Sequence, residues 1–377
     1  MKVERDIAGF SLPFAAGVMA AVYAGDISGT CQMHFSAAAI FAACLFTAVL
    51  MQRKGKRRRP EEIFFLAMCA AFACGIFTGM TGHMLACSTI TGNILAGMHL
   101  TAAAEQMGHA IDALPFDSGD TNAIIKALLT GNRSGLTNEI QDAFRNSGAS
   151  HILALSGLHL GIIYMAIRKI LAFTGNHPAA ACTRSVLTVV FCGMYAAATG
   201  AGPSITRAFL FILLGETARV TGRRTSTAGI MMAALTIQMT ASPMSAAQAG
   251  FQMSYAAMAG IAFIYPVFRK IWDKDTAESN RAIACIGKLP RIIWNSAAIS
   301  ISCQLTTGPV AYLYFGTFPL NFILTNLIAV PLTGAVIPAA LAALFLSYAG
   351  ICPDFLLYVL EAAVRTLHTS LEIIAGM

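Results

Sequence analysis

The chain has 377 residues, of which 56% are hydrophobic and only 11% are charged, and its formal net charge is +7. Ordinary globular domains carry roughly 25% charged residues, so the composition excludes an ordinary soluble domain. Together with a mean hydropathy of +0.67, it is typical of a membrane protein that crosses the bilayer several times.

Apolar stretches recur along the whole chain. They cover residues 7–24, 35–51, 63–80, 186–201, 228–241, 255–268, 297–315 and 320–350. Since a helix needs roughly 20 residues to cross hydrocarbon, we predict an all-α polytopic membrane bundle of about ten to eleven transmembrane spans.

The N-terminal stretch MKVERDIAGF places a charged start before an apolar segment, as a signal peptide does. Signal peptides begin with a basic region, however, whereas Glu4 and Asp6 are acidic and many further spans follow. We therefore interpret the stretch as the first transmembrane helix. It opens an N-terminal three-helix membrane region over residues 1–84.

Positive residues cluster at intervals that match the predicted loops. The clusters are Lys2 and Arg5, the run from Arg53 to Arg59, Arg168 with Lys169, Arg184, Arg219 with Arg223 and Arg224, and the region from Arg269 to Arg291. With the N-terminus in the cytoplasm, every cluster falls on the cytoplasmic side, as the positive-inside rule requires. The run QRKGKRRRP is interpreted as a topology anchor that also contacts anionic lipid, with a nucleic-acid contact as the alternative.

Residues 85–150 are more polar and are predicted to lie outside the cytoplasm. The segments MHLTAAAEQMGHAIDAL and TNAIIKALL have the spaced apolar residues of interfacial or surface helices, and residues 115–120 separate them. These amphipathic helices form the second predicted region.

The C-terminal part begins with an apolar stretch that is too long for one helix. Because it contains Pro319, Pro331 and Pro338, and proline at membrane depth frees backbone groups, we predict a broken or re-entrant segment near residues 318–350. Residues 351–377 form one more span or an interfacial helix, since Glu361, Arg365 and His368 would lie within it.

The ten cysteines show no CxxC spacing. Six of them lie in or beside apolar stretches and are interpreted as small buried hydrophobic residues: Cys44, Cys69, Cys74, Cys182, Cys192 and Cys303. Cys31 and Cys87 both fall outside the cytoplasm in the predicted topology, so whether they pair in an oxidising compartment is left open.

The segment HILALSGLHLG, residues 151–161, places polar side chains in an apolar surrounding. If it forms one helix, His151, Ser156 and His159 share one face. Gly157 and Gly161 have the small-xxx-small spacing that lets another helix approach, and we assign them to helix packing. The polar face either hydrogen-bonds a neighbouring helix or lines a path through the bundle.

Other predicted spans also carry polar side chains. Arg207 and Glu216 lie in one span, and further polar residues follow at Gln252, Ser254, Tyr255, Gln304, Thr306, Thr307, Asn321 and Asn326. Charged and amide side chains in spans usually face the bundle interior or a cavity. Because several helices contribute them, a shared polar passage is favoured over separate private hydrogen bonds.

Four ordered motifs carry a resemblance to a known family. The stretch ALLTGNRSGLTNEIQDAFRNSGASHILALSGLHLGII, then YAAATGAGPSITRAFL, then SPMSAAQAGFQMSYAAMAG, then the run from QLTTGPVAYLYFG to NFILTNLIAVPL resemble the ComEC family of DNA-internalisation competence proteins. The resemblance covers about residues 120–335. It implies a competence-type transmembrane channel domain over residues 151–350.

The resemblance implies a channel in the bacterial cytoplasmic (inner) membrane that admits one DNA strand during natural transformation. The candidate lining residues are His151, Ser156, His159, Arg207, Gln252, Ser254, Tyr255, Gln304, Asn321 and Asn326. Arg207, Tyr255, Tyr312 and Tyr314 offer positive charge and aromatic platforms for single-stranded nucleic acid. The implied partners are single-stranded DNA, membrane lipid, a separate DNA receptor and a cytoplasmic helicase; homo-oligomerisation is left open.

The chain also departs from larger relatives, which carry an OB-like domain before this region and a metallo-β-lactamase-like domain after it. The sequence has room for neither, and no HxHxDH motif is present. Either DNA capture and strand degradation belong to other proteins, or the sequence is part of a longer protein. We assign no catalytic residue, metal ligand or cofactor, and the absence of a GxxxxGK[ST] loop places any motor on another protein.

Two alternatives remain at the level of function. The first is a transporter of another polymer, a lipid or a small solute on the same fold. The second is an intramembrane hydrolase that uses Ser156 with His151 or His159, although the spacing of these residues supplies neither an oxyanion hole nor an orienting acid.

Overall fold

A computed structural model describes residues 2–24, 67–76, 78–79, 100–175, 177–200, 202–223, 225–273, 288–316 and 321–376. Within these ranges the chain forms helices and their connections, with no β-strand. The all-α prediction is therefore confirmed. The chain divides into two compact units, the first made of residues 1–96 and 224–259 and the second of residues 97–223 and 260–377. Each unit is described by itself.

The first unit contains helices from both ends of its sequence range. They are α1 (Lys2–Ala24), the short apolar helix Ala67–Ile76, α12 (Thr227–Ala241), the 3-10 helix η2 (Pro243–Ala247) and α13 (Ala249–Ala259). Glycines allow α1 and the helix Ala67–Ile76 to touch, because a Cβ at Gly17 would overlap the Phe72 carbonyl and a Cβ at Gly75 would overlap the Phe14 carbonyl. Small residues at such positions permit close backbone approach in membranes.

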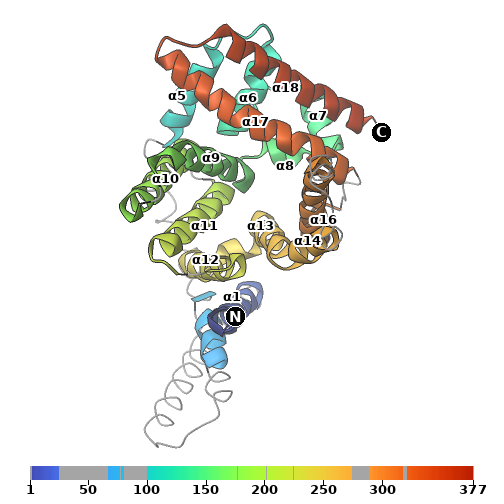
Figure 1. Ribbon diagram of the computed structural model, residues 1–377. Helices are drawn as coiled ribbons and strands as arrows, with labels where there is room; N and C mark the ends of the chain where they lie inside the picture. The colour runs from blue at the N-terminus through green and yellow to red at the C-terminus, as the bar shows by residue number, and fades with distance from the viewer. Residues whose placement is uncertain are drawn as a thin grey trace, which may run out of the picture. The chain divides into compact units, whose positions relative to one another are not determined.

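The second unit holds the remaining helices. They are α5 (Leu100–Asp112), α6 (Gly119–Thr130), α7 (Asn138–Asn146), α8 (Ser150–Leu153), α9 (Gly157–Ile170), η1 (Leu171–Thr174), α10 (Pro178–Ala198), α11 (Pro203–Val220), the π-helical η3 (Gly260–Ile264), α14 (Tyr265–Asp273), α16 (Lys288–Phe315), α17 (Phe322–Tyr348) and α18 (Asp354–Ala375). Figure 1 shows α17 and α18 side by side across α6 and α7. The hydrogen bond from Asn321 Nδ2 to the Ile374 carbonyl, 3.2 Å, shows that α17 and α18 run antiparallel.

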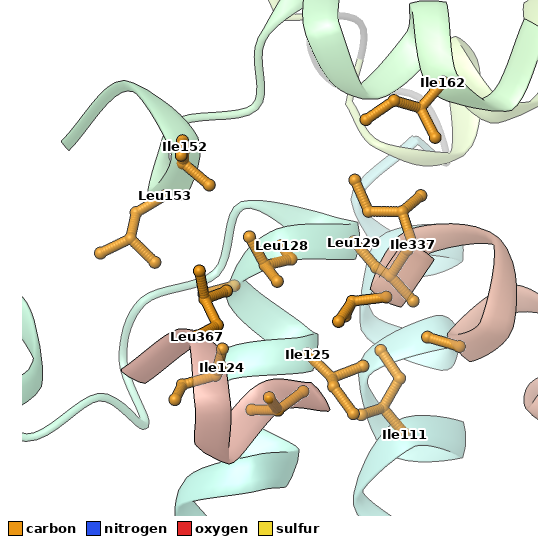
Figure 2. Packing of buried hydrophobic residues seen from close by; sticks show 14 of the residues in the cluster. Ile111, Ile124, Ile125, Leu128, Leu129, Ile152, Leu153, Ile162, Ile337 and Leu367 are labelled. Carbon is orange, nitrogen blue, oxygen red and sulfur yellow. The ribbon is translucent and has the colours of Figure 1, made fainter. Parts of the chain in front are cut away.

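Helix α6 lies at the centre of the main apolar core of the second unit. Its Ile124, Ile125, Leu128 and Leu129 are at most 1% exposed. Figure 2 shows them packed among side chains of α5, α8, α9, α17 and α18. Burying one such side chain stabilises a fold by about 1.5–3 kcal/mol when water is the alternative. The core therefore ties helices from both ends of the unit's sequence to α6.

Helices are present in the segments predicted within residues 85–150. α5 and α6 occupy the predicted segments, and residues 113–118 separate them. One face of α6 is buried in the core of the second unit. The spacing of apolar residues in TNAIIKALL predicts this buried face, but the same spacing is expected whether protein or lipid covers the face.

Three described helices are long and apolar enough to cross a membrane: Ala179–Ala198, Ala249–Ile271 and Phe322–Tyr348. Shorter apolar helices cover Ile7–Tyr23, Ala67–Ile76 and Thr227–Ala241. These helices support the prediction that the protein is a membrane protein. The larger predicted number of spans, the location of the N-terminus and the four predicted regions remain predictions, because the packing of helices does not test on which side of a membrane they lie.

The predicted break near residues 318–350 is wrong for α17, which continues from Phe322 to Tyr348 with Pro331 and Pro338 inside it. Proline removes one backbone donor and usually kinks a helix. In membrane helices it is tolerated, because packing neighbours and local adjustments satisfy the freed carbonyl groups. Ile337 and Ala340, which flank Pro338, are fully buried, so the core holds this part of α17. Pro319 lies outside the described residues.

Residues 351–377 were predicted to form either one more span or an interfacial helix, and the structure shows a helix there without choosing between the two. α18 is one continuous helix, and its buried face packs on the core through Leu360, Val364 and Leu367. Glu361 on the same face is 7% exposed and accepts a hydrogen bond from the Asp117 backbone N–H, 3.4 Å away. α18 is therefore an amphipathic helix on the second unit.

Candidate functional site

The segment HILALSGLHLG does not form one helix, so the predicted common face is wrong. α8 ends at Leu153 and α9 begins at Gly157. Between them Ser156 adopts an extended conformation, with φ −118° and ψ 166°, and is the N-cap of α9. Serine is favoured at this position because its short polar side chain competes with helix continuation and satisfies free backbone groups.

His159 completes this helix start. The Ser156 backbone N–H donates to His159 Nδ1 over 3.2 Å, and Ser156 Oγ lies 2.9 Å from the same nitrogen. A side chain that reaches back from the third helical position to the N-cap N–H is half of a capping box. Because Nδ1 accepts this bond, the proton of the neutral imidazole is on Nε2.

The side chain of His159 is fully enclosed, with no exposed surface. Its Nε2 makes no hydrogen bond of normal geometry within the described part of the chain. A buried donor without a good acceptor costs about 1–3 kcal/mol. His159 therefore has a structural role at the helix start and a second polar atom whose role the cap does not explain.

His151 takes no part in this helix cap. It is on α8, its side chain is exposed, and its Nδ1 lies 3.1 Å from the Gly148 carbonyl. The two glycines assigned to helix packing also differ from each other. A Cβ at Gly157 would meet the Ala208 Cβ at 3.3 Å, whereas a Cβ at Gly161 would have nothing within 4 Å. Of the two, Gly157 is the glycine that lies against α11.

Helices α9 and α11 run parallel, with α10 antiparallel beside them. Gly157 at the start of α9 meets Ala208 of α11, and Arg168 near the end of α9 binds Glu216 further along α11. α10 has its Gly193 against Phe209, near the start of α11. The starts of α9 and α11 therefore lie at one end of this three-helix group and their final turns at the other (Figure 1).

Glu216 is the centre of a polar cluster at that second end. Its side chain is 2% exposed, and Arg168 Nη1 lies 2.8 Å from Oε1 and 2.7 Å from Oε2. Oε1 also accepts from the Tyr164 hydroxyl at 2.6 Å and from Arg219. Such charge-assisted bonds offset much of the desolvation cost of a buried carboxylate.

This cluster was only partly visible in the sequence. Glu216 stands out as a charge in an apolar stretch, whereas Arg168 and Arg219 were assigned only to topology, and Tyr164 was not singled out. The spacing of Glu216 and Arg219 is the one local signal, because residues three apart share a helix face. The partners on α9 are 48 and 52 residues away in sequence, so no local pattern indicates them.

Arg207 is buried one turn into α11, with 4% of its surface exposed. The same helix thus encloses a guanidinium near its start and a carboxylate near its end. Ionisable groups inside apolar helices are costly and generally mark a functional position. The candidate residues His159 and Arg207 are both enclosed by protein within the second unit rather than placed on an open surface.

The remaining candidates of the second unit are dispersed. Asn321 is half-buried and bonds the Ile374 carbonyl, so it joins α17 to α18. Asn326 is also half-buried, and its Oδ1 has no partner among the described residues. Gln304 is half-buried on α16, where Tyr312 is 63% and Tyr314 is 44% exposed.

Two candidates of the first unit, Gln252 and Tyr255, hydrogen-bond to residues of other helices in that unit. Gln252 Nε2 donates to the Tyr23 hydroxyl over 2.9 Å and to the Ala246 carbonyl over 3.0 Å. The Tyr255 hydroxyl donates to Gln238 Oε1 over 2.8 Å. Ser254 is half-buried on the same helix. These bonds connect α13 to α1, η2 and α12.

Residue types that bind metals are scattered through the described ranges. No group of three or more His, Cys, Asp or Glu side chains that could hold a metal ion occurs there. The cysteines within these ranges are free: Cys69, Cys74, Cys182, Cys192, Cys303 and Cys352. Of these, Cys192 is buried as predicted, whereas Cys182 is exposed. Cys31, Cys44 and Cys87 lie outside the described residues.

The fold and these side chains define a class: an all-helical membrane protein with polar and charged groups enclosed between apolar helices. Comparison with known proteins gives the family. The competence protein family matches residues 128–377, which is well over half of the chain, so the protein belongs to this family. The resemblance to the ComEC family is thereby confirmed.

Two curated relatives are longer than the present chain and match it over part of their length. It is 26% identical over 228 residues to ComE operon protein 3 of Bacillus subtilis (strain 168), which covers 60% of this chain and 27% of that protein. It is 23% identical over 235 residues to the uncharacterized protein YcaI of Escherichia coli (strain K12), which covers 61% of this chain and 30% of that protein. The chain thus matches less than a third of either relative. No solved structure matches it.

Proposed function

We propose that the protein is a channel for the passage of single-stranded DNA through the bacterial inner membrane during natural transformation. The observation that carries the proposal is the match to the competence protein family over residues 128–377. ComE operon protein 3 of Bacillus subtilis, by its name, belongs to the ComE operon. The proposal gives the present chain a transport role in the same process.

The buried polar groups support a passage for an anionic polymer. Arg207 supplies a positive charge that is buried in α11, and His159 holds an Nε2–H donor that the helix cap does not use. Single-stranded nucleic acid is bound through positive charge along its backbone together with aromatic platforms for its bases. In the structure, protein encloses both His159 and Arg207. Passage of DNA past them therefore requires α9 and α11 to separate at their N-terminal ends.

The first test is transport itself. Full-length protein reconstituted into liposomes should admit a labelled single-stranded oligonucleotide, and a strain lacking the gene should bind DNA at its surface without becoming transformed. Liposomes that exclude the oligonucleotide but release a lipid or a small solute would support the alternative transporter. Normal transformation of the deletion strain would reject the proposal.

Two substitutions at His159 distinguish a role of this residue in DNA passage from a role in protein stability. Gln at the third helical position also accepts the N-cap N–H, so His159→Gln should keep the melting temperature while reducing transformation at least tenfold. His159→Leu should reduce transformation equally and also lower stability by about 1 kcal/mol, because the cap is lost. Full transformation by a stable His159→Gln protein would show that the imidazole is not needed for DNA passage.

One observation favours a second candidate, an intramembrane hydrolase. Ser156 Oγ lies 2.9 Å from His159 Nδ1, within the reach that a nucleophile and its base require. The Ser156 N–H donates to the same nitrogen, however, and His159 Nε2 has no carboxylate partner among the described residues. Helix capping explains this geometry. Ser156→Ala should therefore leave transport unchanged, and loss of all activity in a stable Ser156→Ala protein would favour the hydrolase.

A further inference from the structure

The second end of the three-helix group α9–α11 is strongly cationic. Arg168 and Lys169 are in the last turn of α9, Arg184 is in the second turn of α10, and Arg219 is in the last turn of α11, followed by Arg223. Between residues 157 and 223 the sequence contains a single acidic residue, Glu216. Its carboxylate binds Arg168 and Arg219, so the two helix ends are held together and most of the positive charge remains uncompensated.

These cations face outward. The side chain of Arg219 is 49% exposed and that of Arg168 is 23% exposed, and Lys169 and Arg223 are exposed as well. Arg184 is half-buried, and its Nε is enclosed without a hydrogen-bond partner in the described ranges. His177, the N-cap residue of α10, is exposed close by in sequence. An anion that approached this end would meet several guanidinium groups together.

Exposed apolar side chains border the same end. Ile170, the last residue of α9, is 66% exposed, Phe173 in η1 is 81% exposed, and Val220 at the end of α11 is 48% exposed. Along α10, Val186, Val190 and Met194 are 54%, 48% and 61% exposed at intervals of four residues, so they form one outward stripe. The surface therefore combines positive charge with an apolar strip that leads away from it.

The position of α10 suggests what covers this surface. Ala179–Ala198 is long and apolar enough to cross a membrane, and it begins at the cationic end. The start of a span lies at the depth of the lipid headgroups, and basic pockets between membrane helices bind anionic headgroups. From these observations we propose that this end binds an anionic phospholipid, with the phosphate among Arg168, Lys169, Arg219 and Arg223 and an acyl chain along the α10 stripe.

A lipid fits these observations better than a nucleic acid does. Single-stranded nucleic acid needs aromatic platforms for its bases, whereas the stripe on α10 consists of two valines and a methionine. The exposed aromatic rings near the stripe are Phe173 and Phe191, the latter 47% exposed on α10. This proposal does not depend on the cargo of the channel.

The test compares two double variants of the full-length protein. Lys169→Gln with Arg223→Gln removes two exposed charges at the proposed site, and both residues are outside the Glu216 cluster. Arg145→Gln with Arg365→Gln is the matched control, because it removes the same charge from side chains that are each 73% exposed on α7 and α18. Native mass spectrometry from neutral detergent would count retained phosphatidylglycerol and phosphatidylcholine.

We expect the parent and the control to retain phosphatidylglycerol in preference to phosphatidylcholine. The Lys169→Gln, Arg223→Gln protein should bind phosphatidylglycerol about 25-fold more weakly, because each of the two basic residues near an anionic headgroup contributes on the order of a fivefold factor. Equal retention by the two double variants, or no preference for the anionic lipid in the parent, would overturn the proposal. So would an oligonucleotide that binds this end while no phosphatidylglycerol is retained. Entry of oligonucleotide into liposomes, measured separately, tests the channel and not this site.

Discussion

Glu216 shows how a carboxylate is accommodated inside an apolar helix bundle. Removing a carboxylate from water costs several kcal/mol unless other groups replace its hydration. Here Arg168 contacts both oxygens, and the Tyr164 hydroxyl and Arg219 contact one of them. Because the contacting groups come from α9 and α11, the same carboxylate that requires compensation also joins the two helices.

We predict that Glu216→Gln destabilises the protein by about 2 kcal/mol, because two arginines would then face a neutral amide. The value is below the roughly 3–5 kcal/mol of a fully buried pair, since the Arg219 side chain is 49% exposed and reaches solvent. Thermal unfolding of the detergent-solubilised protein measures the effect. Glu372→Gln, at a side chain that is 52% exposed, is the control and should change the melting temperature little; equal shifts would mean that the cluster does not stabilise the helices.

At the residue scale, sequence reasoning identified polar side chains but not their partners. Glu216 and Arg207 were noticed because charges are rare in apolar helices. The exposed position of His151 and the buried position of His159 could not be predicted, because the turn at residues 154–156 changes the direction of the chain between them. A helical wheel assumes a continuous helix, and that assumption failed at this position.

At the scale of the element, apolar runs and turn residues located most described helices. They did not distinguish a helix that breaks from one that continues. α8 and α9 are separated within an apolar segment without proline, whereas α17 continues through two prolines. The difference arises because Ser156 and His159 form a local helix cap, while core packing around Ile337 and Ala340 holds α17 together.

The contact between η3 and α16 gives a prediction at this scale. A Cβ at Gly260 would overlap the Ser302 carbonyl and would come within 2.7 Å of Thr306 Oγ1. Gly260→Ala should therefore push the two helices apart and cost about 1–3 kcal/mol, the usual range for overpacking.

The control for this substitution is another helical glycine, Gly334 of α17, where a Cβ would have nothing within 4 Å. Gly334→Ala should be neutral or stabilising by up to about 1 kcal/mol, because alanine has the higher helix propensity. The melting temperatures of the two variants are compared in the same detergent. If Gly260→Ala is as stable as Gly334→Ala, the close approach of η3 and α16 does not limit stability.

At the scale of the whole molecule, packing groups the chain differently from its order in sequence. The first unit joins residues 1–96 to residues 224–259, and the second joins residues 97–223 to residues 260–377. The C-terminal helix α18 belongs to the core around α6. This grouping follows from contacts that are distant in sequence, such as the hydrogen bond from Thr325 Oγ1 to the Ser147 carbonyl, 2.6 Å.

The orientation of α10 is the prediction at this scale. Arg168 and Lys169 precede it, and positive residues remain in the cytoplasm, so Gly175 should lie in the cytoplasm and Gly200 outside it. Alkaline phosphatase, which is active only outside the cytoplasm, should be inactive when fused after Gly175 and active when fused after Gly200. Green fluorescent protein at the same sites should give the opposite pattern. Reversed activities would show that α10 has the opposite orientation in the membrane.

The sequence by itself determined the all-α class, the membrane setting and the family, because composition, apolar length and ordered motifs are properties of the linear chain. Only the tertiary structure decided which polar groups meet. It separated His151 from His159, placed Glu216 between two arginines and buried α6 under α17 and α18. A polar group in an apolar helix must find a partner. The sequence shows which polar groups need one. Which group becomes the partner depends on how helices that are distant in sequence pack together.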